Sequence, residues 1–252
     1  MNDTIQISVV IPALNEQPNL APLKNALIES LEPIDRCFEV IFVDDGSTDG
    51  TYDEISGFAR KDERFRGVRL KGRMGKAVAL GAGFSVAHGE ILIALDGDNQ
   101  DDPREIPAFL EKIEEGYDLV TGWKKVRRDT GFRVLASNRF NGVVRWISGL
   151  PLHDFNCGFK AMRREVVDSL PLHGGWHRFI PVFANLAGFR VGEIAVEHRA
   201  RMFGRSKYGF GRYLRGLVDC LRLFAIVRLS VAAPTSGPNI TENEIAERVG
   251  FN

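Results

Sequence analysis

The sequence predicts an α/β protein in which helices flank a mainly parallel sheet. Short apolar runs rich in Val, Ile and Phe alternate with segments of helical periodicity over the first 123 residues, and several runs end directly in polar loops. Such alternation is typical of strands joined by crossover helices. With 252 residues, 44% of them apolar, the chain is large enough to bury a substantial core.

The predicted elements follow one another at short spacing. Apolar runs indicate strands at residues 7–11, 38–43, 66–70, 91–95 and 117–123, and helical patterns occupy 19–31, 52–62, 75–89 and 105–116. After a basic loop, further helices are predicted at 134–149 and 173–188, followed by a strand-like segment at 189–201. We expect one α/β domain over residues 1–211, an amphipathic helix over 212–233 and a polar tail over 234–252.

The amphipathic helix has two faces with different chemistry. Apolar residues recur at 214, 217, 218, 221, 224 and 225, whereas the other side carries Arg212, Arg215, Asp219 and Arg222. A helix with a basic side can lie in an anionic membrane interface. Packing on the chain's own domain is an equally good interpretation, and both stay open here.

The net charge of zero hides a strong asymmetry along the chain. Residues 1–120 carry 23 acidic and 12 basic side chains, and residues 121–230 carry 7 acidic and 20 basic ones. This split predicts a cation site in the first part and an anion site, or an anionic surface, for the second.

The cysteines and the apolar runs exclude several other classes of protein. Cys37, Cys157 and Cys220 are odd in number and far apart, which indicates neither a disulfide framework nor a zinc site and favours a reducing, cytosolic environment. No signal-peptide pattern opens the sequence, and no apolar window reaches the ~18 residues that span a bilayer. We therefore expect a chain that does not cross a membrane.

Three polar loops follow the C-terminal ends of predicted strands: PALNE at 12–16, DDGSTDGT at 44–51 and LDGDNQDDP at 95–103. In parallel sheets, ligands bind at the carboxyl ends of the strands. The three loops are therefore expected to meet at one edge of the sheet and form a single site.

The loop at 95–103 has the composition of a cation site. Asp96, Asp98 and Gln100 alternate, and two carboxylates with an amide oxygen suit a hard ion such as Mg²⁺ or Mn²⁺. The alternative is a solvated loop in which Asp101 or Asp102 caps a helix that begins near residue 103. An EF-hand is excluded, because Asp101 and Pro107 stand where that loop needs Gly and Glu.

Asp45 and Glu16 are candidates for contacts with a nucleobase or ribose, although Asp, Gly, Ser and Thr are also ordinary turn residues. Two glycine patterns fail as nucleotide motifs. GAGFSV at 81–86 lacks the third glycine of a dinucleotide fingerprint, and GRMGKA at 72–77 lacks the spacing and hydroxyl of a P-loop.

The segment HRARMFGRSKYG at 198–209 is strongly basic. Arg201 and Lys207 lie six residues apart across a glycine and could converge on phosphates, one as a bidentate fork and the other as a point charge. A basic surface loop is the alternative.

Taken in order, ISVVIPALNE, VDDGSTDGT, ALDGDNQDDP, CGFKAMRR, HRFIP and HRARMFGRSKYG resemble the family 2 glycosyltransferases, in the branch of dolichol-phosphate mannose synthase and bacterial polyprenyl-phosphate glycosyltransferases. The resemblance runs from about residue 5 to residue 219. It implies a Rossmann-like GT-A catalytic domain, a divalent metal (Mg²⁺ or Mn²⁺) and inversion at the anomeric carbon.

The resemblance also implies roles for single residues. Around the nucleotide it places Pro12, Glu16, Val43, Asp45 and Lys124; at the nucleotide and sugar it places Asp96, Gly97 and Asp98; on the metal it places Asp98 and Gln100. Arg201 and Lys207 would hold donor and acceptor phosphates, and Arg139 would contact the acceptor phosphate. Asp96, Asp98, Arg201 and Lys207 are the residues expected to carry catalysis.

The function implied is transfer of a hexose-type sugar from GDP-mannose or a UDP-sugar to polyprenyl or dolichyl phosphate. A lipid phosphate is already ionised near pH 7, so no general base is needed and the histidines are interpreted as structural. The expected setting is peripheral, on the cytoplasmic face of a membrane, with no nucleic acid partner and a membrane-anchoring protein partner left open. Two alternatives remain: transfer to a saccharide hydroxyl with Asp154 as base, and an inactive nucleotide-sugar or lipid-binding module.

Overall fold

The computed structural model describes residues 4–125, 131–172, 176–200, 203, 211–229 and 244–251, with the backbone alone for 131–136, 211–215 and 217. The strands are β1 (Ile7–Ala13), β2 (Phe38–Asp44), β3 (Phe65–Leu70), β4 (Ile91–Ala94), β5 (Leu119–Lys124), β6 (Lys160–Arg163), β7 (Val191–Val196) and β8 (Ile245–Val249). The α-helices are α1 (Gln17–Leu31), α2 (Thr51–Lys61), α3 (Lys76–Val86), α4 (Ile106–Glu114), α5 (Gly131–Ser148), α6 (Arg164–Ser169), α7 (Ile180–Leu186) and α8 (Gly211–Arg228). Two 3-10 turns are η1 (Pro103–Glu105) and η2 (Trp176–Arg178).

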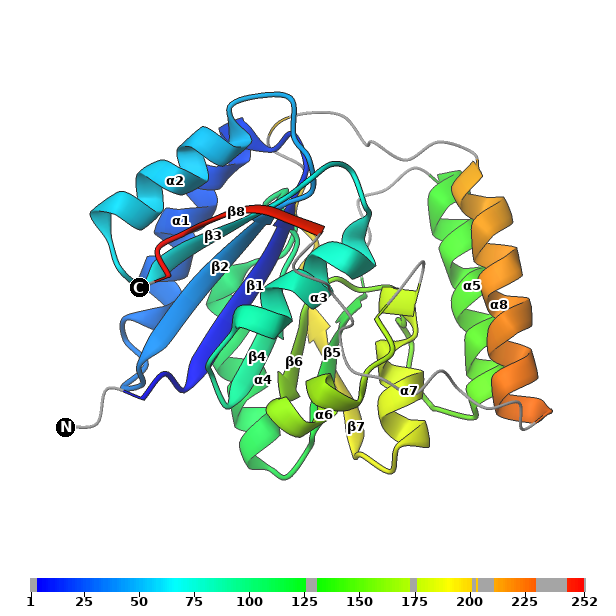
Figure 1. Cartoon of the computed structure of the whole chain (residues 1–252). Coiled ribbons are helices and arrows are strands. Elements are labelled where there is room, and N and C mark those ends of the chain that lie inside the picture. Colours follow the sequence, from blue (N-terminus) through cyan, green and yellow to red (C-terminus); the bar gives the residue numbers. More distant parts are fainter. Residues whose placement is uncertain are drawn as a thin grey trace.

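The described strands form one sheet in the order β7-β5-β6-β4-β1-β2-β3-β8 (Figure 1). Strands β4, β1, β2 and β3 are mutually parallel, and β5 is parallel to β7. β6 runs antiparallel to both β4 and β5. The predicted mainly parallel sheet is therefore confirmed. Strand β6 was not predicted, because four residues with basic ends give no clear apolar run.

Helices cover both faces of the sheet, and alternate side chains of the central strands supply the two cores. Val9 and Ile11 pack on the face covered by α1, α2 and α4, whereas Val10 packs on the face covered by α3. This is why the strands read as continuous apolar runs. With both faces buried, solvent-facing polar groups concentrate at the ends of the strands.

The C-terminal segment differs from the expected polar tail. Residues 245–249 form β8, which pairs antiparallel with β3 at the edge of the sheet, and the N–H of Lys71 donates to the carbonyl of Glu244 at 3.0 Å. This strand was not predicted, because its five residues, IAERV, place two charges beside three apolar residues. Edge pairing of backbone groups does not require a continuous apolar pattern.

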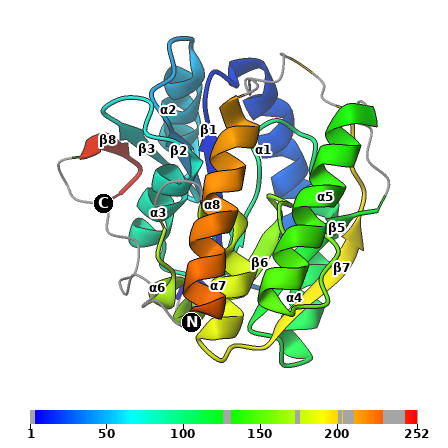
Figure 2. The same cartoon turned by 90° about the vertical axis from the view of Figure 1, so that its right-hand side faces the viewer.

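Helix α8 lies beside α5, and Figure 2 shows the pair side by side at one side of the molecule. Asp219, Cys220 and Leu223 of α8 are buried, while Val218 and Leu221 are exposed. Asp219 was expected on the polar, outward face. It instead faces the domain, because Arg178 of η2 lies 3.6 Å from its carboxylate and compensates the charge.

Candidate active site

The three polar loops meet at the carboxyl edge of the sheet, as predicted. Hydrogen bonds join the first two loops to each other and the third loop to the first turn of α1. The N–H of Asn15 donates to Ser47 Oγ at 2.8 Å, and its side-chain oxygen accepts from the N–H of Thr48 at 2.8 Å. Asn99, in the third loop, donates from Nδ2 to the carbonyl of Asn19 at 2.7 Å. Asn15 and Asn99 adopt positive φ angles of 50° and 60°, a conformation that asparagine tolerates better than most residues.

Four of the expected nucleotide residues lie close together on this edge. Pro12 pairs with Val43 across β1 and β2, and a Cβ at Gly97 would fall 3.1 Å from the carbonyl oxygen of Pro12. Glu16 is buried and accepts from Asn19 Nδ2. The side chain of Val43 belongs to the core on the α3 side, so it shapes the site from beneath.

Asp45 is buried at the end of β2 and faces the segment that leads into α3. Its Oδ1 accepts from the N–H groups of Met74 at 2.6 Å and Gly75 at 2.9 Å, and its Oδ2 accepts from Gly75 at 3.0 Å. Burial raises the pKa of Asp45, and the two amides act in the opposite direction. Asp45 therefore orders the start of α3, a role that the sequence did not reveal.

Asp96 follows β4 and is paired with Lys76, the first residue of α3. Burial alone would raise the pKa of Asp96, but the charges of Lys76 and Lys124 outweigh it and the pKa is lowered. The negative charge that seemed to require a metal is thus balanced at this position by a lysine from the neighbouring loop.

The remaining acidic residues of the loop have separate partners. Asp101 is buried and pairs with Lys124 at 2.7 Å, so it does not begin the next helix. Asp102 does: its Oδ1 accepts from the N–H of Arg104 at 3.1 Å and caps η1. Arg199 also pairs with the Asp102 carboxylate.

Lys124 ends β5, and its side chain is 10% exposed. Burial by itself would lower the pKa of Lys124. The charge of Asp101 and of neighbouring groups raises the pKa by more than burial lowers it, so the pKa is raised and the ammonium form is stabilised. Because the ammonium pairs with Asp101, contact with a nucleotide would have to share or replace that pair.

The basic segment after β7 is anchored on the acidic loop. The N–H of Arg199 donates to the carbonyl of Gln100 at 2.9 Å, and Gln100 Nε2 donates to the carbonyl of Arg199 at 3.3 Å. Arg201 and Lys207 lie outside the described residues. Arg139 is described and is exposed on α5, the helix that packs beside α8.

Asp98 and Gln100 are the expected metal ligands, and both are half-buried at the strand-end edge. Asp98 Oδ1 accepts from the N–H of Gln100 at 3.2 Å, and the amide of Gln100 donates through Nε2, so Oε1 is the atom it offers to a cation. Among the described residues, no three Asp, Glu, His or Cys side chains cluster as metal ligands. The donor set therefore fits a hard ion that takes one or two protein oxygens and completes its shell with water and substrate phosphates.

The sequence reasoning missed a group of residues on this edge. Lys160 opens β6, is 2% exposed, and donates from Nζ to the carbonyl of Cys157. His177 of η2 has a buried Nδ1 without a hydrogen-bond partner among the described residues. Burial, followed by the charges of Lys76 and Arg178, holds the pKa of His177 well below its usual 6.5. Lys76 does carry a signal in the sequence, because it begins a helix, where the helix dipole favours negative side chains over positive ones.

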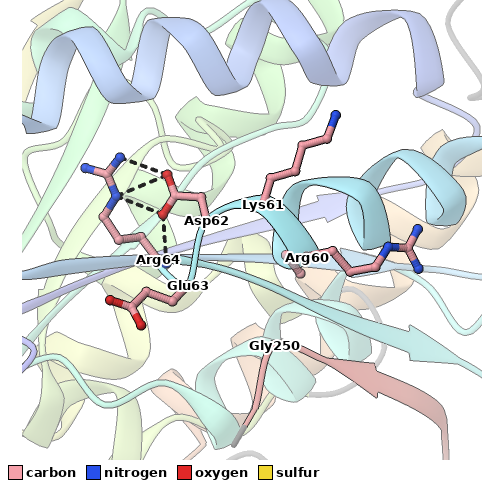
Figure 3. A pocket seen from close by; sticks show the side chains of 7 residues that line it. Arg60, Lys61, Asp62, Glu63, Arg64 and Gly250 are labelled. Atoms are coloured by element: carbon pink, nitrogen blue, oxygen red, sulfur yellow. Dashed lines mark hydrogen bonds and ion pairs between the residues drawn. The ribbon is translucent and has the colours of Figure 1, made fainter.

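One surface pocket lies elsewhere. It is lined by residues 59–64 and Gly250, where α2 ends and β3 begins (Figure 3). Arg64 and Asp62 form an ion pair of 2.8 Å in it, and the hydrogen bonds from Arg64 lower the pKa of Asp62. The pocket sits near the amino end of β3, away from the edge where the three loops meet.

Comparison with known proteins identifies the family and agrees with this fold. The sequence profile of glycosyl transferase family 2 matches residues 8–170. A dodecaprenyl-phosphate galacturonate synthase of Rhizobium johnstonii is 35% identical over 235 residues, covering 90% of this chain and 70% of that protein. An undecaprenyl-phosphate 4-deoxy-4-formamido-L-arabinose transferase of Aeromonas hydrophila is 36% identical over 235 residues, covering 90% of this chain and 72% of its own length.

Solved structures show the same fold. Glucosyl-3-phosphoglycerate synthase from Mycobacterium tuberculosis, in complex with Mn²⁺, UDP-glucose and phosphoglyceric acid, has a TM-score of 0.67 at 24% identity, covering 93% of this chain and 90% of that chain. The architecture is an α/β fold of the GT-A type. The chain belongs to glycosyl transferase family 2.

Proposed function

We propose that this glycosyltransferase moves a hexose-type sugar from a nucleotide-sugar, GDP-mannose or a UDP-sugar, to polyprenyl phosphate with inversion at the anomeric carbon. The observation that carries the proposal is the docking of the basic segment after β7 on the acidic loop after β4, through Arg199, Gln100 and Asp102. This contact brings the start of the basic segment next to Gln100, two residues along the chain from Asp98. Two relatives that act on polyprenyl phosphates by name support the choice of acceptor.

The donor would lie across the strand-end edge. Pro12, Glu16 and Asp45 would surround the nucleoside, and Asp96 would contact the sugar. Asp98 and Gln100 would hold Mg²⁺ or Mn²⁺, which neutralises charge on the diphosphate as it leaves. A Mn²⁺-bound neighbour of the same fold supports a divalent metal here.

The acceptor needs no general base, because a phosphate monoester already carries negative charge at neutral pH. Arg201 and Lys207 would bind the phosphates, and Arg139 would contact the acceptor phosphate. Asp154, the candidate base for transfer to a saccharide hydroxyl, is buried, and its Oδ1 accepts from the N–H of Asn156 at 3.0 Å. That burial favours a structural role for Asp154.

The membrane would be met by the paired helices α5 and α8. Both helices carry exposed arginines and exposed apolar side chains. The apolar ones are Val143 and Trp146 on α5, Val218 and Leu221 on α8, and Leu229 directly after α8. Of the described helices, none is long and apolar enough to span a membrane. The exposed apolar and basic side chains support a peripheral contact, since apolar burial and basic charge act together at anionic lipid surfaces. The face proposed for this contact is the cytoplasmic one.

Replacement of Asp98 tests the proposal. Asp98→Ala is expected to abolish sugar transfer to a short polyprenyl phosphate, measured with GDP-mannose and UDP-sugars in the presence of Mn²⁺. Asp168→Ala removes an exposed carboxylate of α6 and is the matched control, with transfer unchanged. Turnover of Asp98→Ala equal to wild type would rule the assignment out, and transfer to a saccharide alone would favour the second acceptor class.

A further inference from the structure

Gly158 lies directly against the carboxylate of Asp96. A Cβ atom built on Gly158 would fall 2.5 Å from Asp96 Oδ2, 2.7 Å from Cγ and 2.8 Å from Oδ1. Carbon atoms in contact prefer about 3.5–4.0 Å. The space that any other residue would fill with its side chain is therefore taken by the end of Asp96.

The strand register explains why these two residues meet. β4 and β6 pair antiparallel, with Leu92 opposite Met162 and Ala94 opposite Lys160. Two residues beyond the last pair, the same register places Asp96 opposite Gly158. Directly opposed residues on antiparallel strands have Cβ atoms only about 4.5–5.5 Å apart, so a carboxylate turned toward its partner needs that partner to be small.

Both sides of this arrangement are fixed by lysines. Lys76 pairs with Oδ1 of Asp96 from the α3 side. Lys160, which is 2% exposed, donates from Nζ to the carbonyl of Cys157 and so holds the turn that carries Gly158. The carboxylate is confined between an ammonium and a backbone turn.

We propose that Gly158 is a positioning residue that sets the orientation of the Asp96 carboxylate. Because Gly158 has no side chain, the Asp96 carboxylate can occupy the space above it, and Lys76 holds the carboxylate there. The effect on sugar transfer rests on the proposed function, in which Asp96 contacts the donor. The contact between Gly158 and Asp96 is independent of that proposal.

A double-mutant cycle separates this role from general damage to the fold. The four proteins are wild type, Gly158→Ala, Asp96→Ala and the double variant, each measured for melting temperature and for transfer with the donor that wild type uses. Gly158→Ala is expected to lower the melting temperature and to reduce kcat by about 100-fold, the order seen for misplaced catalytic groups, with the KM for the acceptor unchanged. In the Asp96→Ala background, the added methyl has room and should cost nothing further, within about twofold.

Gly57→Ala is the matched control. Gly57 lies in α2, and nothing comes within 4 Å of a Cβ built on it, so melting temperature and kcat should not fall. Equal losses from Gly158→Ala in both backgrounds would overturn the proposal, because the glycine would then act through another contact. If wild type transfers no sugar, the proposed function fails, and the cycle in melting temperature still decides whether Gly158 and Asp96 are coupled.

Discussion

Charged side chains at the strand-end edge have specific partners. Lys76 pairs with Asp96, Lys124 with Asp101, and Arg199 with Asp102. Buried charges are costly unless they are paired in this way, so each partner matters more than its exposure suggests. His177 is different, since its Nδ1 is buried without a hydrogen-bond partner among the described residues.

His177 should make the protein sensitive to mild acid. Its folded-state pKa is lowered, so between that value and 6.5 the unfolded chain binds more protons and the free energy of unfolding falls as pH falls. The limiting slope is about 1.4 kcal/mol per pH unit. His177→Gln should reduce the loss of stability between neutral pH and pH ~5, measured by urea unfolding. Parallel curves for the two proteins would contradict this account.

Gly46 and Gly149 allow strain and crowding to be measured separately. Both have φ of 73°, but a Cβ at Gly46 would lie 2.4 Å from the backbone carbon of Gly72, whereas nothing lies within 4 Å at Gly149. Gly149→Ala should cost about 1–2 kcal/mol from the left-handed conformation alone. Gly46→Ala should cost about 1–3 kcal/mol more, because backbone must move. Equal losses in the free energy of unfolding for the two variants would contradict this, because they would show that the backbone at Gly72 moves aside without an energetic cost.

At the scale of elements, the packing of α8 supports one of the two interpretations of its pattern and leaves room for the other. Cys220 and Leu223 pack into the core, whereas Val218 and Leu221 are exposed, 41% and 63%. The rings of Trp146 and Phe224 stack at 5.9 Å and join α5 to α8. The helix packs on its own domain and still presents an apolar face, so one role does not exclude the other.

This exposed face predicts the effect of a single polar substitution on membrane binding. Leu221→Ser should weaken binding to vesicles of mixed anionic and zwitterionic lipid by about 1 kcal/mol, which is about fivefold. Leu186→Ser, at an exposed leucine on α7, is the control. Co-sedimentation measures both variants. Unchanged binding of Leu221→Ser, or an equal loss in the control, would exclude this face as the specific contact.

At the scale of the molecule, the charge asymmetry of the sequence becomes a contact between its two parts. Lys124 and Arg199 come from the basic part and pair with Asp101 and Asp102 of the acidic part. Much of the charge in the loop after β4 is balanced internally as a result. The predicted cation site narrows to Asp98 and Gln100, which would share their ion with a diphosphate.

Ligand binding to this site should stabilise the whole domain. A nucleoside diphosphate with Mn²⁺, at about 100 times its Kd, adds about 2.7 kcal/mol to the free energy of unfolding. For a domain of this size that corresponds to a rise in melting temperature of roughly 5–10 °C. Removal of the metal with EDTA should reverse most of the rise. A rise in melting temperature that persists in EDTA, or in the Asp98→Ala variant, would show that ligand binding does not depend on a metal held by Asp98.

Much of the fold could be predicted because its signals are local. Apolar runs and polar loops located the parallel strands and placed PALNE, DDGSTDGT and LDGDNQDDP on one edge. Strands β6 and β8 were not predicted, since four residues with basic ends and five residues that include two inner charges show too little periodicity. The roles of Lys76, Lys160 and Gly158 were not predicted for another reason. Each role depends on a contact made in the folded chain, such as those of Lys76 and Gly158 with Asp96, and no local pattern indicates it.

The sequence by itself determined the family, the mainly parallel sheet and the polar loops at one edge of it, because motif order and strand periodicity are properties of the chain. Only the tertiary structure decided which lysine balances which carboxylate, which face of α8 is buried, and why residue 158 is a glycine. These depend on the register between strands and on packing between helices. A shift of the strand register by one residue would change every one of these contacts and leave the sequence motifs as they are.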